Sequence, residues 1–304
     1  MFMKRRLVEQ GGVTLMLSMP REWTKKHRLK KGDEVEILEK DNNLLVAAEK
    51  VARTEATELD ITNLSSLINF GLSALYVKGV DELTLTSQNP ELIQKLPQKP
   101  LNQFIGFEII EQSKNRLVTK DLSGMQHVEF QPMLRRVFLL LQNMYDELAK
   151  GIENHETNFD HIVSMDLNVN RFCFLCLRML NKKGYEDFKH TQTMFLLVTF
   201  LEQIGDQLKE FADYITTRKV VFSDKEQKDF RRVVHLFIEY QSLFFKFNVE
   251  KAVKIDSSYR KFHNEFETLL DHTKSPSHVR ALLYFDSLAK ITAELLRTQL
   301  MMVL

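Results

Sequence analysis

The sequence predicts an α+β protein in which strands dominate the first part of the chain and helices the remainder. Up to about residue 125, short apolar runs alternate with turn residues, which is typical of strands. From about Glu129 onward the apolar residues lie three and four positions apart, as they do on amphipathic helices. The chain has 304 residues, which is enough for two or three domains.

Residues 1–50 are predicted to form short strands around one short helix. Gly11 and Gly12 mark a turn, and Pro20 favours a helix start because its missing N–H is not needed there. The predicted elements are a strand over 13–19, a helix over 21–27, and strands over 35–37 and 44–46 joined by a turn over 40–43. About fifty residues are too few for a stable core, so this module is expected to need a partner or a second copy.

Residues 51–125 are predicted to be a small α/β segment that connects the two ends of the chain. Its predicted elements are a helix over 64–77 and strands over 82–86, 107–110 and 116–119, with Pro97 and Pro100 in a loop. The segment contains no glycine-rich phosphate-binding loop and no nucleophile motif.

Residues 126–304 are predicted to be an all-α domain. Six stretches carry apolar residues at helical spacing: 133–148, 162–179, 197–215, 230–247, 259–269 and 282–296. The predicted breaks fall at 181–184, 216–224 and 274–277. Three helices, a linker and three more helices indicate an internal duplication, with repeats over 126–217 and 224–304.

Positive charge is concentrated at the N-terminus. The whole chain has a formal net charge of only +1, but residues 1–31 contain nine Lys or Arg against two Glu. The candidate contacts are Lys4, Arg5, Arg6, Arg21, Lys25, Lys26 and Arg28. Cationic side chains dominate DNA binding through phosphate contacts, and Arg also binds guanine edges. The alternative interpretation is an ordinary solvated surface.

The residues from Arg5 to Trp23 read RRLVEQGGVTLMLSMPREW, and residues 29–35 read LKKGDEV. This order of strand, proline, short helix and Lys-Gly-Asp turn resembles the AbrB/SpoVT/MazE family of swapped-hairpin modules. The resemblance implies an intertwined homodimer whose basic loops grip DNA through the cations named above, with Trp23 in the core. Antitoxins of that family end in a short tail instead of a helical domain of this length.

An acidic pair lies in the third predicted helix. Glu202 and Asp206 are four residues apart, so both carboxylates share one face beside the apolar stripe. Clustered carboxylates hold hard metal ions. The alternative is a solubilising acidic stripe on an ordinary bundle helix.

The run Leu-Glu-Gln-Ile-Gly-Asp over 201–206 and the run from Asp166 to Asn170 resemble the paired motifs of the PhoU phosphate-uptake regulators. That resemblance covers 128–304 and implies a divalent or ferric metal at Asp166, Asn170, Glu202 and Asp206. At the matching positions of the second repeat, Arg260 and Lys290 replace acids. The second site is therefore expected to be lost, with Arg260 paired to Asp286.

Other residues with possible chemistry favour structural roles. Cys173 and Cys176 lie on one helix face, as a redox pair or half of a metal site would, but no second pair of ligands matches them. They are predicted to be reduced, buried packing thiols. The chain has no Glu-x-x-His motif and is not expected to be an enzyme. Phe245 falls outside the apolar stripe and is predicted to face a partner.

Together these patterns predict a cytoplasmic homodimer that binds DNA and regulates transcription, and the resemblance to PhoU implies that the regulated functions concern phosphate uptake. No apolar run reaches the ~18 residues of a membrane span, and no signal-peptide stretch follows the basic start, so no membrane insertion is expected. The order of domains resembles archaeal phosphate-uptake regulator-like proteins, and the bundle is predicted to sense a signal or dock on a transporter ATPase or signalling protein. The alternative function is a scaffold that docks on a phosphate transporter or kinase, and the third is a metal-dependent enzyme.

Overall fold

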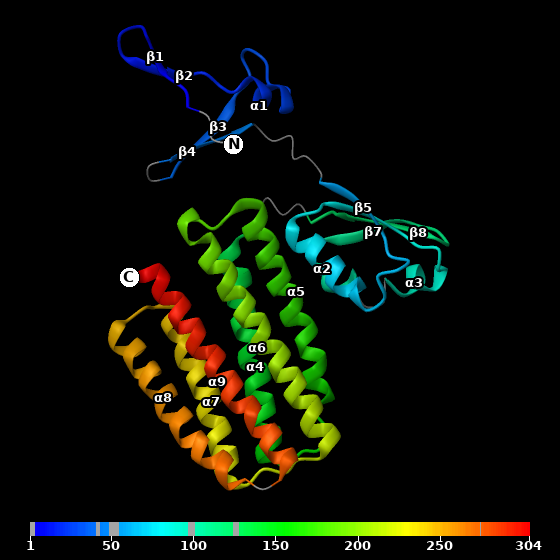
Figure 1. Cartoon of the computed structure of the whole chain (residues 1–304), viewed down its shortest axis with the longest axis vertical. Helices are drawn as coiled ribbons and strands as arrows, with labels where there is room; N and C mark the ends of the chain where they lie inside the picture. The colour runs from blue at the N-terminus through cyan, green and yellow to red at the C-terminus, as the bar shows by residue number, and fades with distance from the viewer. Residues whose placement is uncertain (1–3, 41–42, 49–54, 97–100, 124–127, 274) are drawn as a thin grey trace. The chain divides into compact units, whose positions relative to one another are not determined.

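A computed structural model describes residues 4–40, 43–48, 55–96, 101–123, 128–273 and 275–304. It confirms the predicted α+β class, with strands at the N-terminal end and a mostly helical region after them (Figure 1). Contacts divide the chain into two compact units, Met1–Arg53 and Thr54–Leu304, which are described separately below.

The N-terminal unit consists of two antiparallel hairpins and a short helix. Its elements are β1 (Leu7–Gln10), β2 (Thr14–Leu17), α1 (Arg21–Lys26), β3 (Val35–Lys40) and β4 (Asn43–Ala48). β1 pairs with β2 and β3 pairs with β4, in two separate two-stranded sheets. The predicted strands and helix are confirmed, and the turn predicted over 40–43 includes Asp41 and Asn42, which lie outside the described residues.

The second unit begins with a four-stranded sheet. Its elements are β5 (Ala56–Asp60), α2 (Ile68–Lys78), β6 (Glu82–Thr86), α3 (Pro90–Lys95), β7 (Phe107–Gln112) and β8 (Arg116–Asp121). The strand order is β5-β6-β8-β7, with β5 parallel to β6 and the other pairs antiparallel. The predicted helix and three predicted strands are present, whereas β5 and α3 were not predicted. Pro97 and Pro100 lie outside the described residues.

Six long helices follow the sheet. They are α4 (Phe130–Glu153), α5 (Asp160–Lys183), α6 (Thr191–Arg218), α7 (Asp224–Phe245), α8 (Val249–His272) and α9 (Pro276–Val303). Their ends carry the expected signals: Gly184 follows α5 with a positive φ of 74°, and Ser223 and Glu226 form a reciprocal capping box at the start of α7. All six predicted helices are therefore confirmed.

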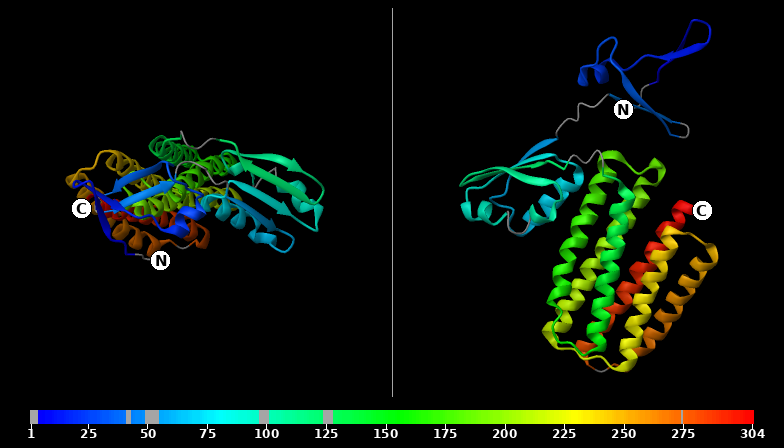
Figure 2. Two further views of the ribbon diagram at one scale, coloured as in Figure 1. Left: turned by 90° about the horizontal axis from the view of Figure 1, so that it is seen from above. Right: turned by 180° about the vertical axis from the view of Figure 1, so that it is seen from behind.

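The two sets of three helices have the same pattern of neighbours. α4 contacts α5 and α6 as α7 contacts α8 and α9, and α4–α7 and α6–α9 contacts join the sets. Fully buried aromatic rings fill the shared core, among them Phe138, Phe211, Phe230, Phe237 and Phe285. Figure 2 shows the bundle from behind, with α8 at one side of it and the sheet of the same unit at the other.

Two predictions about single residues meet different outcomes. Cys173 and Cys176 are both free and buried in the bundle core, as predicted. The prediction that Phe245 faces a partner stays a prediction. Its ring packs 5.3 Å from that of Phe138, and the Arg135 guanidinium lies 4.0 Å above it, but the side chain is only partly buried.

In the part of the chain that the structure describes, no helix combines the length and the apolarity needed to cross a bilayer.

Candidate nucleic-acid interface and polar clusters

The predicted DNA contacts lie on the surface of the N-terminal unit. Lys4, Arg5 and Arg6 precede β1, and Arg21, Lys25 and Lys26 are on α1, with Arg28 just after it. All seven side chains are exposed. Arg21 and Lys25 are one turn apart and so share a face of α1. Five of the seven, Lys4, Arg6, Arg21, Lys25 and Arg28, form no ion pair with any described residue.

The local fold follows from turn and capping residues. Gly11 and Gly12 have φ values of +71° and +79°, a conformation that other residues rarely adopt, and they reverse the chain between β1 and β2. Pro20 immediately precedes α1, and its carbonyl accepts from the N–H of Thr24 at 3.0 Å. The Trp23 ring lies 4.8 Å from that of His27, but Trp23 is only half-buried within one chain.

Over residues 4–37, the N-terminal unit contributes no buried side chain. On the β1–β2 hairpin, Leu7, Leu15 and Leu17 are each more than half exposed. An isolated two-stranded hairpin is at best marginally stable in water. The fold of this unit therefore requires apolar contacts beyond those that one copy makes within it.

The predicted metal residues meet between α5 and α6. The Asp166 carboxylate is buried and accepts a hydrogen bond from the Asn170 amide at 3.0 Å. Lys209, one turn after Asp206 on α6, reaches across to Asp166 Oδ2 at 2.8 Å and also contacts Asp206. Lys209 was not singled out from the sequence, because its partner Asp166 is on another helix.

Burial shapes the electrostatics of this cluster. Removal from water raises the pKa of Glu202 to about 7, and the neighbouring carboxylates of Asp206 and Asp166 add to the effect. Burial also raises the pKa of Asp166, although Lys209 opposes this. For Lys209, burial acts against the charged form, but the hydrogen bonds to Asp166 and Asp206 prevail and raise its pKa. The ammonium group therefore stays charged at neutral pH.

This arrangement does not fit a bound metal ion. An ammonium group lies between two of the carboxylates that would have to ligate the metal, and a second cation there would be repelled. Among the described residues, no group of three or more His, Cys, Asp or Glu side chains is placed to hold one.

The corresponding residues of the second set of helices form different pairs from those predicted. The expected ion pair between Arg260 and Asp286 is wrong. Arg260 instead pairs with Asp256 on its own helix, with Nε 2.7 Å from Oδ2. Asp286 contacts His263, with Nδ1 2.8 Å from Oδ1. The cause is geometric: Arg260 follows Asp256 by one helical turn, so the two side chains are neighbours on one face.

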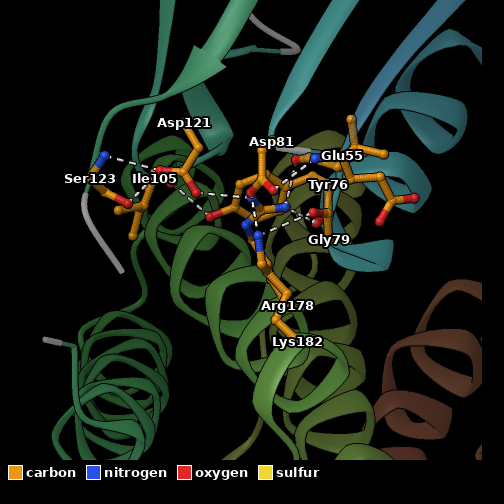
Figure 3. A network of polar contacts seen from close by, with 10 residues as sticks. Glu55, Tyr76, Gly79, Asp81, Ile105, Asp121, Ser123, Arg178 and Lys182 are labelled. Carbon is orange, nitrogen blue, oxygen red and sulfur yellow. Dashed lines mark hydrogen bonds and ion pairs between the residues drawn. The ribbon is translucent and has the colours of Figure 1, made fainter. Parts of the chain in front are cut away.

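A buried arginine joins the sheet to the bundle and was missed by sequence reasoning. Arg178 of α5 is fully buried and donates through Nη1 to the carbonyls of Tyr76 at 2.8 Å and Val80 at 2.7 Å. Its Nη2 donates to Asp81 at 2.7 Å and Asp121 at 2.9 Å (Figure 3). The available signal was its position between the apolar residues Leu177 and Met179.

Neighbouring residues complete this joint. Lys182, one turn after Arg178, also contacts Asp81. Burial acts to raise the pKa of Asp121, but hydrogen bonds from Ser123 and Arg178 lower it below its ordinary value. Gly79 ends α2 with a φ of +111°, and a Cβ there would lie 3.0 Å from the Lys182 side chain. Glycine is favoured here by the positive φ, and a larger residue would also require the Lys182 side chain to shift.

Comparison with known proteins finds one similarity. Residues 10–54 match the sequence model of the MazE antitoxin family, described as antidote-toxin recognition MazE, bacterial antitoxin. No curated protein matches the chain, and no solved structure does. The match begins at the last residue of β1 and covers β2, α1, β3 and β4. It confirms the N-terminal part of the resemblance: the chain carries a DNA-binding-type module similar to MazE at this end.

Proposed function

We propose that this protein is a homodimeric DNA-binding regulator whose helical unit acts as a sensor or as a docking site for a partner. The observation that carries the proposal is the N-terminal unit: seven exposed cations on a module in which none of residues 4–37 is buried. Such a module needs a second copy for its fold, and the pair then presents fourteen cations to a duplex.

Charge supports nucleic acid as the ligand. DNA presents closely spaced phosphates, and each Lys or Arg that neutralises one releases counterions. Exposed cations without an acidic neighbour are suited to this, and five of the seven form no ion pair with a described residue. The similarity of residues 10–54 to the MazE family gives independent support for a DNA-binding-type module.

The second copy of the chain is the simplest source of the missing core. The apolar side chains of β1 and β2 face solvent along both strands, and Leu7, Leu15 and Leu17 are among them. Two identical hairpins that pack together would bury these residues in both chains. The half-buried Trp23 would gain cover in the same way.

The finer proposal is that the regulator controls phosphate uptake. It rests on the resemblance of residues 128–304 to PhoU proteins, with the bundle docking on a transporter ATPase or a signalling protein. The regulator is proposed to have no enzymatic activity of its own.

The test is a fluorescence-anisotropy titration of a mixed-sequence duplex at several salt concentrations. If six phosphates are neutralised across the dimer, log K falls against log salt with a slope of roughly −5. Replacement of Arg21, Lys25 and Lys26 by Ala is expected to remove most of that slope and most of the affinity. The matched control replaces three exposed lysines of the helical unit, Lys225, Lys228 and Lys254, by Ala and is expected to bind as the wild type does.

Equal weak binding by the wild type and the Arg21, Lys25 and Lys26 variant would reject DNA binding by α1. Sedimentation of the same proteins separates the two parts of the proposal. A dimer that does not bind DNA would favour the alternative scaffold function, in which the module only dimerises. A monomer at micromolar concentration would reject the paired module altogether.

A further inference from the structure

We infer that Lys209 is a built-in cation that takes the place of a metal ion between α5 and α6, so that the bundle keeps its acidic cluster without metal. The cluster consists of Asp166, Glu202, Asp206 and Asn170, the residues for which the sequence predicted metal binding. The inference concerns the helical unit alone and does not depend on DNA binding.

The position of the ammonium group is the first argument. Lys209 Nζ contacts carboxylates on two different helices, Asp166 of α5 at 2.8 Å and Asp206 of α6. A metal ion bridging α5 and α6 would have to use these same two carboxylates. The Lys209 side chain is about a third exposed, so its stem packs against the helices while its charge is held inside the cluster.

The remaining oxygen atoms are the second argument. Asp166 Oδ1 and Asn170 Oδ1 are buried and have no hydrogen-bond partner. Gly205 leaves room for this carboxylate, because a Cβ there would lie 3.2 Å from Asp166 Oδ1. The cluster thus retains hard oxygen donors of the kind that metal cations prefer. The ammonium group of Lys209 is what prevents a metal cation from binding to them.

The second set of helices provides an independent parallel. There Asp256 is paired with Arg260 and Asp286 with His263, on the helices that correspond to α5 and α6. Both sets therefore supply side-chain partners to their acids, although they use different residues at different positions. A signal that reaches the bundle is accordingly expected to be something other than a metal ion at these two places.

The test removes the charge of Lys209 but keeps most of its volume, in Lys209→Met. Binding of Mn²⁺ to the full-length chain is measured by electron paramagnetic resonance of the free ion. The wild type and the charge-preserving variant Lys209→Arg are expected to bind Mn²⁺ at least tenfold more weakly than Lys209→Met does. The control Lys225→Met, at an exposed lysine of α7, is expected to behave as the wild type does. Asp206→Asn in the Lys209→Met background is expected to abolish the gained site.

Equal Mn²⁺ affinity of the wild type and Lys209→Met would overturn the inference, and so would a Lys209→Met protein that folds but gains no site. A second measurement does not depend on the variant folding. The melting temperature of the wild type is compared in EDTA and in excess Mn²⁺, because an ion that binds only the native state must raise the melting temperature. No shift is expected, and a clear rise would show that the wild-type cluster accepts metal with Lys209 in place.

Discussion

The two sets of three helices share a packing pattern but differ in what their outer helices contact. α5 packs on α2 and inserts Arg178 under the four-stranded sheet, where the guanidinium is fully buried. α8 is the counterpart of α5 in the second set. When Asp256 is matched to Asp166, Thr268 takes the position of Arg178, and Thr268 is exposed. At this position α5, which the sheet covers, holds a buried charge. The same position of α8, which no described residue covers, holds a solvent-exposed hydroxyl group.

The comparison extends to how each set neutralises its acids. In the first set, Lys209 joins two helices through Asp166 and Asp206. In the second, Arg260 and Asp256 pair along one exposed helix face, and the corresponding acid of α9, Asp286, is joined to α8 by His263. An ion pair that joins partly buried helices contributes to tertiary structure, whereas an exposed pair within one helix contributes little.

The largest expected effect is at Arg178. Arg178→Met leaves Asp81 and Asp121 in a largely buried position without their guanidinium, which is expected to lower the free energy of unfolding by about 3–5 kcal/mol. Chemical denaturation of the full-length chain measures this. The matched change in the other outer helix, Arg260→Met, removes an exposed pair and is expected to cost no more than about 0.5 kcal/mol. Similar losses for both variants would remove the distinction between α5 and α8.

A smaller effect is expected from the raised pKa of Glu202. The folded state holds this proton up to about pH 7, whereas the unfolded chain releases it near the ordinary value of 4.5. The wild type therefore loses stability as the pH rises through that window, by on the order of 1 kcal/mol given the partial exposure of the group.

Glu202→Gln removes this dependence, so its stability relative to the wild type is expected to be greater at pH 8 than at pH 5. Thermal unfolding across that range checks the prediction. Glu267→Gln, on the exposed face of α8, is the control for loss of one carboxyl group. A Glu202→Gln curve parallel to the wild type would mean that the carboxyl group is ionised normally in the folded protein.

The smallest effect is expected on the outer face of α8. Val249 and Val253 lie one turn apart and are 58% and 60% exposed. Changing both to Thr is expected to alter stability by no more than about 0.5 kcal/mol. A loss above 2 kcal/mol that depends on protein concentration would instead show that this face is covered by another copy of the chain.

Sequence reasoning succeeded where a repeated pattern determines structure. The six long helices follow from apolar residues three and four apart, and the breaks predicted over 181–184 and 216–224 coincide with the end of α5 and the start of α7. β5 was missed because its residues Ala56–Asp60 include only one large apolar side chain, Leu59. α3 was missed because six residues are too few for a helical period to stand out.

The polar clusters were harder to predict because their partners are distant in sequence. Arg178 and Asp81 are 97 residues apart, and Lys209 and Asp166 are 43 apart. The acids of the first cluster were identified correctly as neighbours, but nothing in local spacing indicated that a lysine lies among them. The seven N-terminal cations could be predicted to be exposed from composition alone, since charged residues on a small module have little interior to enter.

The absence of buried side chains over residues 4–37 of the N-terminal unit has a consequence for regulation. A module that acquires its interior only by association has a folded population set by the amount of protein present. Dissociation and unfolding then become a single equilibrium. When most chains are monomeric, the concentration of dimer able to bind a polyanion rises with roughly the square of the protein concentration. The cell can therefore tune such a module through synthesis and degradation alone, with no ligand required.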